Sequence, residues 1–414
     1  MSSSSINYDI AVIGGGASGM MAASIASKQG LRVLLIEKNK ELGKKLSITG
    51  GARCNITNAE QDTKILLLNY GKASKFLHSA FAQFGMQDTI DYFESLGLPI
   101  KIESKKRAFP VSEKAQDVVD VLVKELSRNK VDVITGSEVK KISMADNSIS
   151  GVVVDGKEYR ADKYILATGG TSRPETGSTG DGFKWLLQMG HTIRQPTPNI
   201  TPLAIKESWV KEVSGVKVDD VEVVFYSEGT RSFKVNGGIL FTHFGISGPI
   251  ILNSAYKVVE LLEQGRVTAH IDLFPTENQK ELDTRLIGIL ETHRSKLIKN
   301  VFEYILPPGL SNVVRGLLES EVNLDNNCSE FSKADRMKVI KLLKELPLTV
   351  EGLMGFEKAV VADGGVDLSE IDTRTMQSRI VSNLFITGDL LDINRPSGGY
   401  SLQLCWTTGY VAGS

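Results

Sequence analysis

Three glycines with the spacing of a nucleotide-binding turn predict chemistry more clearly than other residues of this sequence. Gly14, Gly16 and Gly19 form a G-x-G-x-x-G run. In such a run the first glycine permits a tight turn, the second lets the backbone approach a pyrophosphate, and the third lets a helix pack closely on a strand. The helix that begins here offers free N–H groups and a positive dipole end to phosphates, so Ala17 and Ser18 are expected beside the ligand.

The elements expected around this run are those of a dinucleotide-binding βαβ unit. An apolar, β-branched stretch at 8–13 predicts a buried parallel strand, 20–29 predicts a helix, and 32–36 predicts a second strand. Glu37 ends the second strand, where a carboxylate can bind a ribose 2′-OH and repel a 2′-phosphate. The pattern predicts a bound dinucleotide other than NADP, and it leaves both FAD and NAD open.

The segment that follows Glu37 favours a flavin. Residues 38–58 are basic and contain glycines, where simple NAD dehydrogenases have a short loop before another βα unit. Paired glycines give close backbone approach, and Arg53 can bring charge to a pyrophosphate. A solvated basic loop is the alternative interpretation. The cofactor residues expected from this stretch are Lys38, Lys45, Gly51, Arg53, Cys54 and Asn55.

Two later apolar strands, within 163–170 and 384–389, each run into a glycine turn. Ligands of such sheets lie at the carboxyl ends of the strands, so both turns are expected at the cofactor. Asp389 suits the hydroxyls of a ribityl chain, which NAD lacks. Strand-like segments from 131 to 151 predict a β-meander whose backbone touches adenine. The expected residues are Val139, Ala167, Thr168, Gly169, Gly388 and Asp389.

A glycine turn at 398–399 opens the last expected helix. Its free N–H groups and dipole favour negative charge, which reduced flavin carries around N1 and the C2 carbonyl. The hypothesis is that the backbone of Gly399, Tyr400, Ser401 and Leu402 stabilises the reduced ring. An ordinary helix start without a ligand is the alternative.

Together these motifs resemble the HI0933-like (BaiN-type) flavoproteins of the glutathione-reductase-like FAD/NAD(P)-binding group. The resemblance covers essentially the whole chain. Besides the glycine run with Glu37, it rests on Lys45 and on the blocks Thr49–Asn58, Ala167–Gly170, Thr176–Gly182, Thr242–Pro249, Gly364–Val366, Gly388–Asp392 and Gly398–Tyr400.

The resemblance implies a two-part domain that holds FAD non-covalently, and some similar proteins are NAD(P)H-dependent reductases, including reductases of steroid or bile-acid type. This sequence departs from the family pattern near the expected flavin ring. Arg173 replaces a common aromatic residue, Asp389 a glutamate, residues 394–397 a more glycine-rich stretch and Ser401 an asparagine. These departures put a transferred substrate in doubt more than they affect FAD.

The expected fold class is α/β, with a Rossmann-like parallel-sheet FAD domain and β-meander interrupted by a β-rich, barrel-like insert that carries a helical segment. The expected boundaries are 1–194 and 350–414 for the FAD domain and 195–349 for the insert. Three prolines between 195 and 202 predict an extended linker, and 363–366 predicts a turn between strands.

Composition excludes several other classes of protein. A formal net charge of −1 argues against a nucleic-acid partner, and the sequence has no apolar run that could cross a membrane. The start of the chain lacks a signal-peptide pattern, so the cytoplasm is expected. The three cysteines form no C-x-x-C pair and the five histidines have no metal-ligand spacing, so neither a dithiol nor a metal site is expected. His191 is expected to cap a helix, and His243 is the best candidate for acid–base catalysis, although a structural role is the stronger expectation for it.

The predicted function is FAD-dependent oxidoreduction, with hydride passing through flavin N5 to an unidentified small molecule. NAD(P)H is the expected donor, and it would bind transiently because the sequence has no second G-x-G-x-x-G run after a strand. No catalytic residue is named, since the cofactor itself carries such chemistry. The alternatives are an NAD-dependent dehydrogenase without flavin, a protein whose FAD is structural or regulatory, and a nucleic-acid-modifying flavoprotein.

Overall fold

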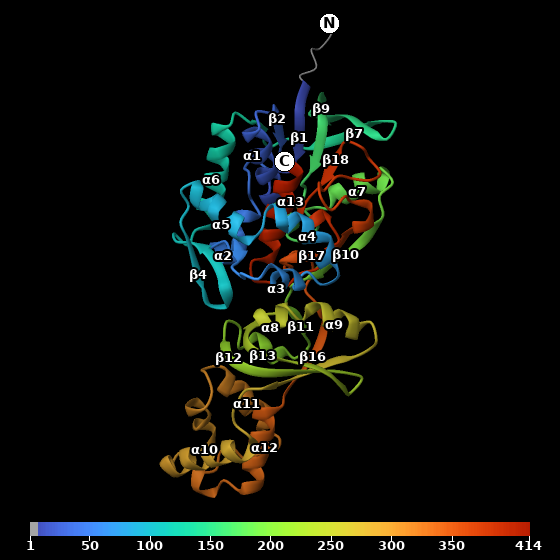
Figure 1. The fold of residues 1–414 in the computed structure, drawn as a ribbon. Helices are drawn as coiled ribbons and strands as arrows, with labels where there is room; N and C mark the ends of the chain where they lie inside the picture. Colours follow the sequence, from blue (N-terminus) through green and yellow to red (C-terminus); the bar gives the residue numbers. More distant parts are fainter. Residues whose placement is uncertain (1–6) are drawn as a thin grey trace. The chain divides into compact units, whose positions relative to one another are not determined.

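The computed structural model describes residues 7–414, which divide into two units. The first unit is built around a central, mostly parallel sheet (Figure 1). Strand β1 lies between β2 and β9 and pairs with both in parallel, and β18 pairs in parallel with β9. The sheet consists of β6 (Asp132–Ile134), β2 (Val33–Ile36), β1 (Asn7–Ile13), β9 (Lys157–Leu166), β8 (Ser148–Val154) and β7 (Val139–Ala145), with β18 (Leu384–Ile386) beside β9.

The carboxyl ends of four parallel strands meet at one edge of this sheet. Ile13 at the end of β1 is in register with Ile36 of β2 and with Leu166 of β9, and Leu166 is in register with Ile386 of β18. All four residues are buried, as expected for strands covered on both faces. The glycine turn and the two later strand ends that the sequence indicated are therefore brought together.

The predicted β-meander is present. Strand β7 pairs antiparallel with β8, and β8 pairs antiparallel with the first half of β9. Because β9 continues into the parallel sheet, the meander is continuous with the sheet that carries the strand ends.

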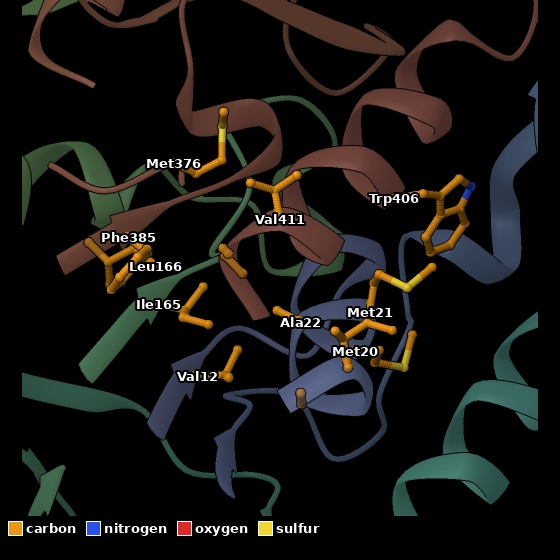
Figure 2. Packing of buried hydrophobic residues seen from close by; sticks show 14 of the residues in the cluster. Val12, Met20, Met21, Ala22, Ile165, Leu166, Met376, Phe385, Trp406 and Val411 are labelled. Carbon is orange, nitrogen blue, oxygen red and sulfur yellow. The ribbon is translucent and has the colours of Figure 1, made fainter. Parts of the chain in front are cut away.

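Helices α1 (Ala17–Lys28) and α13 (Tyr400–Gly413) pack against each other in the core. A Cβ atom added at Gly409 or Gly413 would lie 2.4 Å from the backbone oxygen of Ser18 or Ala22. The absence of side chains at these two positions lets the helices approach backbone to backbone. Figure 2 shows Met21 of α1 and Trp406 of α13 in the same buried cluster as Val12 of the sheet.

Shorter elements complete this unit. Strands β3 (Thr57–Asn58), β5 (Arg107–Pro110) and β4 (Ile100–Glu103) form a small antiparallel sheet. The remaining helices are α2 (Thr49–Ala52), α3 (Thr63–Leu68), α4 (Ser74–Gln83), α5 (Met86–Ser95), α6 (Ala115–Arg128) and α7 (Asp181–Gln188).

The second unit is a closed barrel with a helical extension, which confirms the barrel-like insert with a helical segment. Its apolar core is separate from that of the first unit. The barrel order is β11 (Leu203–Ile205), β14 (Gly245–Ser247), β13 (Thr230–Thr242), β12 (Lys217–Ser227), β15 (Val267–Asp272) and β16 (Leu346–Leu353). The helices are α8 (Pro249–Leu252), α9 (Ala255–Leu262), α10 (Gln279–Thr292), α11 (Leu310–Leu318) and α12 (Lys333–Lys344).

The two units divide at Pro198 and Lys358, the second being Asn199–Lys358. The segment expected to be an extended linker forms strand β10 (Ile193–Asn199), which pairs with β17 (Val361–Val366). The turn expected at 363–366 is therefore wrong, because these residues lie inside β17. Gly364 has φ +97°, and a Cβ there would lie 2.7 Å from the backbone oxygen of Gln195, so close strand approach explains the glycine.

Candidate FAD site

A pocket opens at the carboxyl edge of the parallel sheet, entirely within the first unit. The turn after β1, the end of β2, the turn after β9 and the first turn of α13 all contribute to its wall. It contains about 1190 Å³ of space free of protein atoms, part of which is open to solvent. Its wall runs across the ends of several neighbouring elements, as the site of an extended ligand would.

The three glycines of the turn have different surroundings. Gly14 has φ +107°, and a Cβ there would lie 2.4 Å from the backbone oxygen of Ala167. A Cβ at Gly19 would lie 1.8 Å from the backbone oxygen of Gly14, whereas a Cβ at Gly16 would have no atom within 4 Å. Gly14 and Gly19 therefore hold the turn, strand and helix together, and Gly16 leaves its side of the backbone open.

Glu37 is buried and locks the same turn from the end of β2. Its Oε2 accepts a 2.7 Å hydrogen bond from the backbone N–H of Gly15, and its Oε1 accepts bonds of 2.7 Å from the backbone and side-chain amides of Asn39. The Asn39 amide also donates to the backbone oxygen of Thr176 at 3.0 Å. Glu37 therefore holds the glycine turn directly and the segment at Thr176 through Asn39, and it also lines the pocket.

Thr168 supports a polar ligand in this pocket. Its hydroxyl oxygen is buried and has no hydrogen-bond partner among residues 7–414, yet the residue lines the pocket. Burying an unpaired hydroxyl costs about 1–3 kcal/mol, so native structures rarely retain one without a function. A ligand with hydroxyl or phosphate oxygens, as FAD has, would satisfy it.

Lys45 and Asp389 form an ion pair in the pocket wall, with 3.3 Å between Nζ and Oδ2. Arg395, whose side chain is 1% exposed, forms a second ion pair with Asp389. Burial alone would raise the pKa of the Asp389 carboxyl, but the charges of Arg395 and Lys45 hold it below its usual value. Asp389 therefore presents a carboxylate, an acceptor suited to ligand hydroxyls.

Most of the residues that the sequence indicated come together in this pocket. They derive from six separate stretches of the chain, which the fold unites at one edge of the sheet. Those in the wall are Gly14, Gly16, Ala17, Ser18, Glu37, Lys38, Lys45, Val139, Ala167, Thr168, Gly169, Asp389, Ser401 and Leu402.

Arg53 does not line the pocket, contrary to the expectation that it brings charge to a pyrophosphate. Its guanidinium lies 2.5 Å from Glu103 and 3.0 Å from Glu113, and it stacks 4.2 Å from the ring centroid of Phe109. Two carboxylates and an aromatic face thus hold the charge on the small β3-β5-β4 side of the unit. Gly51, Cys54 and Asn55 are likewise absent from the wall.

Four other expected residues lie behind the wall and shape it. Gly19 packs α1 as described above, and the N–H of Gly388 donates to the Thr408 hydroxyl at 3.0 Å. Gly399 has φ +102°, and a Cβ there would lie 2.3 Å from the carbonyl carbon of Thr57. The Tyr400 carbonyl accepts a 2.9 Å hydrogen bond from the Tyr70 hydroxyl. Gly399 and Tyr400 thus fix the start of α13, and Gly388 contacts a later turn of the same helix.

One part of the pocket wall, formed by residues between 176 and 185, was not predicted from the sequence. Lys38 donates to Asp181 at 2.9 Å, which links the end of β2 to the start of α7. Burial would raise the pKa of Asp181, but hydrogen bonds from Thr179 and Lys38 lower it below its usual value. The glycine-rich block at 176–182 was a visible signal for this wall. Its members in the wall are Thr176, Gly177, Ser178 and Asp181, with Trp185 beyond them.

His191 caps α7 through its backbone, as expected: its N–H donates to the Leu186 carbonyl at 2.9 Å, and the N–H of Gly190 donates to the Leu187 carbonyl at 3.1 Å. The buried ring of His191 lies 2.8 Å from Glu370 through Nδ1 and 2.9 Å from the Ser378 hydroxyl through Nε2. The residue types match a hydrolase triad. However, Ser378 is buried, and its hydroxyl oxygen already accepts hydrogen bonds from the backbone N–H groups of Ile380 and Val381. The group is therefore a structural cross-link.

His243 lies exposed at the turn between β13 and β14, with its ring 4.7 Å from that of Phe244. This position is in the second unit and outside the pocket wall. The three cysteines are free thiols, and no cluster of potential metal ligands occurs within residues 7–414. No helix in that part of the chain is long and apolar enough to cross a membrane.

The chain matches the model of the HI0933-like protein Rossmann domain over residues 8–414. A 3-dehydro-bile acid Δ(4,6)-reductase of Clostridium scindens is 32% identical over 413 residues, 98% of either chain. A ribosomal RNA dihydrouridine synthase of Escherichia coli is 28% identical over 404 residues, 98% of this chain and 96% of the relative.

Solved structures show the same fold at low identity. The 3-ketosteroid Δ1-dehydrogenase of Sterolibacterium denitrificans superimposes with a TM-score of 0.55 at 13% identity, covering 98% of each chain. A flavocytochrome c3 fumarate reductase gives a TM-score of 0.54 at 18% identity, over all of this chain and 78% of the other. The family resemblance of the motifs is confirmed: the chain belongs to the HI0933-like family and is a flavin-dependent oxidoreductase.

Proposed function

We propose that this chain is an NAD(P)H-linked reductase that uses FAD to reduce a carbon–carbon double bond conjugated to a carbonyl group in a small molecule. The observation that carries the proposal is the full-length similarity to the Clostridium scindens reductase, at 32% identity. That relative's name describes reduction of double bonds in a 3-oxo bile acid. An enone is the simplest acceptor consistent with that chemistry.

The residues of the pocket suit FAD. Bound FAD would supply hydride transfer, and the protein would supply binding, orientation and electrostatics. We assign the diphosphate to the Gly14–Gly19 turn and the start of α1, where N–H groups and the helix dipole favour anions. Glu37 would bind the adenosine ribose, and Asp389 with Thr168 would bind hydroxyls of the ribityl chain.

The donor is expected to bind transiently, since the one glycine turn of this type belongs to the FAD pocket. An anaerobic titration of the purified protein with NADH and with NADPH tests this step. We expect one of the two to bleach the flavin absorbance. Flavin that neither nucleotide bleaches, but that dithionite does, would contradict the proposal and favour a redox-silent cofactor.

The acceptor is tested by mixing the reduced protein with enones and quinones in the absence of oxygen and following reoxidation of the flavin. A 4-ene-3-oxo steroid, a short-chain enone and a benzoquinone form a suitable panel. Return of the yellow colour with an enone, together with the saturated product by mass spectrometry, is the expected result. Return with the quinone alone would overturn the assigned acceptor.

A uridine base in RNA is the second candidate acceptor, because the Escherichia coli relative is a ribosomal RNA dihydrouridine synthase at 28% identity. Uracil also contains a double bond conjugated to a carbonyl, so the two reductions are chemically alike. The formal net charge of −1 gives no excess of positive charge for binding RNA. Incubating the reduced protein with ribosomal RNA that lacks dihydrouridine, followed by nucleoside mass spectrometry, separates the two candidates.

A further inference from the structure

A chain of buried polar contacts runs along the pocket wall from the end of β18 to the start of α13. Arg395 donates from Nε to the Ser401 hydroxyl at 3.1 Å, from Nη1 to the Ile393 carbonyl at 2.6 Å, and from Nη2 to Asp389. Lys45 contacts the same carboxylate from its other side, at 3.3 Å.

Arg395 itself does not line the pocket, but three of its neighbours do. Asp389, Ser401 and Lys45 are in the wall, whereas the Arg395 side chain is 1% exposed. A guanidinium has a rigid fork of donors, so it fixes its acceptors in direction as well as in distance. Arg395 thereby ties the carboxylate expected at the ribityl chain to the first turn of α13.

The charges of this group do not cancel. Two buried or half-buried cations, Arg395 and Lys45, share one carboxylate, Asp389. The group therefore carries one net positive charge in a site of low dielectric, where charge interactions are stronger than in water. Two-electron-reduced flavin is an anion at neutral pH, and nearby charge tunes its potential.

We propose that Arg395 is a positioning residue for FAD, which orients Asp389 and Ser401, and that its charge raises the reduction potential of the bound flavin. The proposal rests on FAD binding in this pocket and deepens that assignment. It does not depend on the identity of the acceptor. The sequence marks Arg395 as a departure from the family's more glycine-rich stretch, as it does Asp389, and the structure shows that these two departures are paired.

The test is the reduction potential of the FAD-saturated protein, measured by equilibration with a reference dye, together with the FAD dissociation constant. In R395M the group loses its net charge, and we expect the preference for reduced over oxidised FAD to fall at least tenfold. A tenfold change corresponds to about 30 mV for a two-electron couple. R395K keeps the charge, so its potential should stay near that of the wild type while FAD binds more weakly.

A double variant guards against a trivial loss of folding, because removing one partner of a buried ion pair is strongly destabilising. D389N/R395M removes one charge of each sign and leaves Lys45, so its potential should return towards the wild-type value. Arg336→Met, which breaks the partly buried Arg336–Asp283 pair of the second unit, should leave the potential unchanged.

Three results would overturn the inference. The first is an unchanged potential in R395M. The second, which applies if R395M does not fold, is a lowered potential in R395K or in the double variant. The third is FAD affinity that none of the variants alters. A protein that binds no FAD even as the wild type would instead refute the cofactor assignment, so the two failures are distinguishable.

Discussion

Thr168 and Thr171 are partly buried threonines whose hydroxyl oxygens are buried and have no partner among residues 7–414, but only Thr168 lines the pocket. This difference makes them a matched pair for testing the ligand. Replacing either by valine removes the hydroxyl at nearly constant volume and relieves about 1–3 kcal/mol of unpaired burial.

We expect Thr168→Val to raise the free energy of unfolding of the FAD-free protein by about 1 kcal/mol and to weaken FAD binding about fivefold, the size of one modest hydrogen bond. Thr171→Val should raise the free energy of unfolding alone. Urea unfolding and fluorescence titration with FAD measure the two quantities. Equal FAD affinity in both variants would show that the Thr168 hydroxyl does not bind the ligand.

Cys54 makes the stability of the protein depend on pH in the alkaline range. Burial raises the pKa of its thiol from 9.0 to about 12, although a hydrogen bond with Thr49 opposes the shift. The folded protein thus holds this proton more tightly than the unfolded chain, whose thiol titrates near 9. The contribution of the protonated Cys54 thiol to the free energy of unfolding is complete below about pH 9 and is lost as the pH rises towards 12.

The measurement is urea unfolding of the wild type and of Cys54→Ala between pH 8.5 and 10.5. Above the pKa of the unfolded thiol, the wild type should lose up to about 1.4 kcal/mol more per pH unit than the variant. Parallel pH profiles for the two proteins would mean that Cys54 does not titrate as its burial implies.

At the scale of the element, the approach of α1 to α13 depends on a missing side chain. A Cβ at Gly409 would lie 2.4 Å from the backbone oxygen of Ser18, a contact that only backbone movement can relieve. Overpacking of this kind costs about 1–3 kcal/mol. Because Ser18 lines the pocket, the same movement should also weaken FAD binding.

We therefore expect Gly409→Ala to lower both the midpoint of urea unfolding and the affinity for FAD. Gly288 of α10 is the control, since it is exposed and a Cβ there would meet no atom within 4 Å. Gly288→Ala should stabilise the protein by about 0.4–1 kcal/mol, because alanine favours helix and restricts the unfolded chain. Equal effects of the two substitutions would contradict close helix contact as the reason for Gly409.

The elements of the candidate nucleotide site could be predicted because their signals are local. The turn from Gly14 to Gly19 needs three glycines within six residues, and the acid at Glu37 directly follows its strand. Arg53 shows where local reasoning stops. Its partners Glu103 and Glu113 are 50 and 60 positions away along the chain, so no local spacing could reveal that they pair with its charge. Gly364 likewise suggested a turn, but contact with the backbone near Gln195 explains it.

At the scale of the whole molecule, the β-rich insert could be predicted from short, turn-rich segments, but the closure of its barrel could not. Closure depends on the pairing of β11 with β16, two strands separated by most of the insert. The pocket wall shows the same dependence on distant pairing. Trp185 carried no local signal, and it joins the wall through the position of α7.

The two units are expected to fold independently of each other. Every residue of the pocket wall belongs to the first unit, each unit has its own apolar core, and the chain leaves and re-enters through the paired strands β10 and β17. Neighbouring strands lie about 5 Å apart, so a short glycine-serine linker can replace residues 199–358.

The shortened protein should fold and bind FAD with an affinity within about threefold of the wild type, less than one hydrogen bond contributes. FAD content after gel filtration and the dissociation constant from fluorescence titration measure this. Residues 199–358 expressed alone should unfold cooperatively, because their core does not include residues of the first unit. A shortened protein that folds but is colourless, beside an insert that folds alone, would show that the second unit is needed to complete the FAD site.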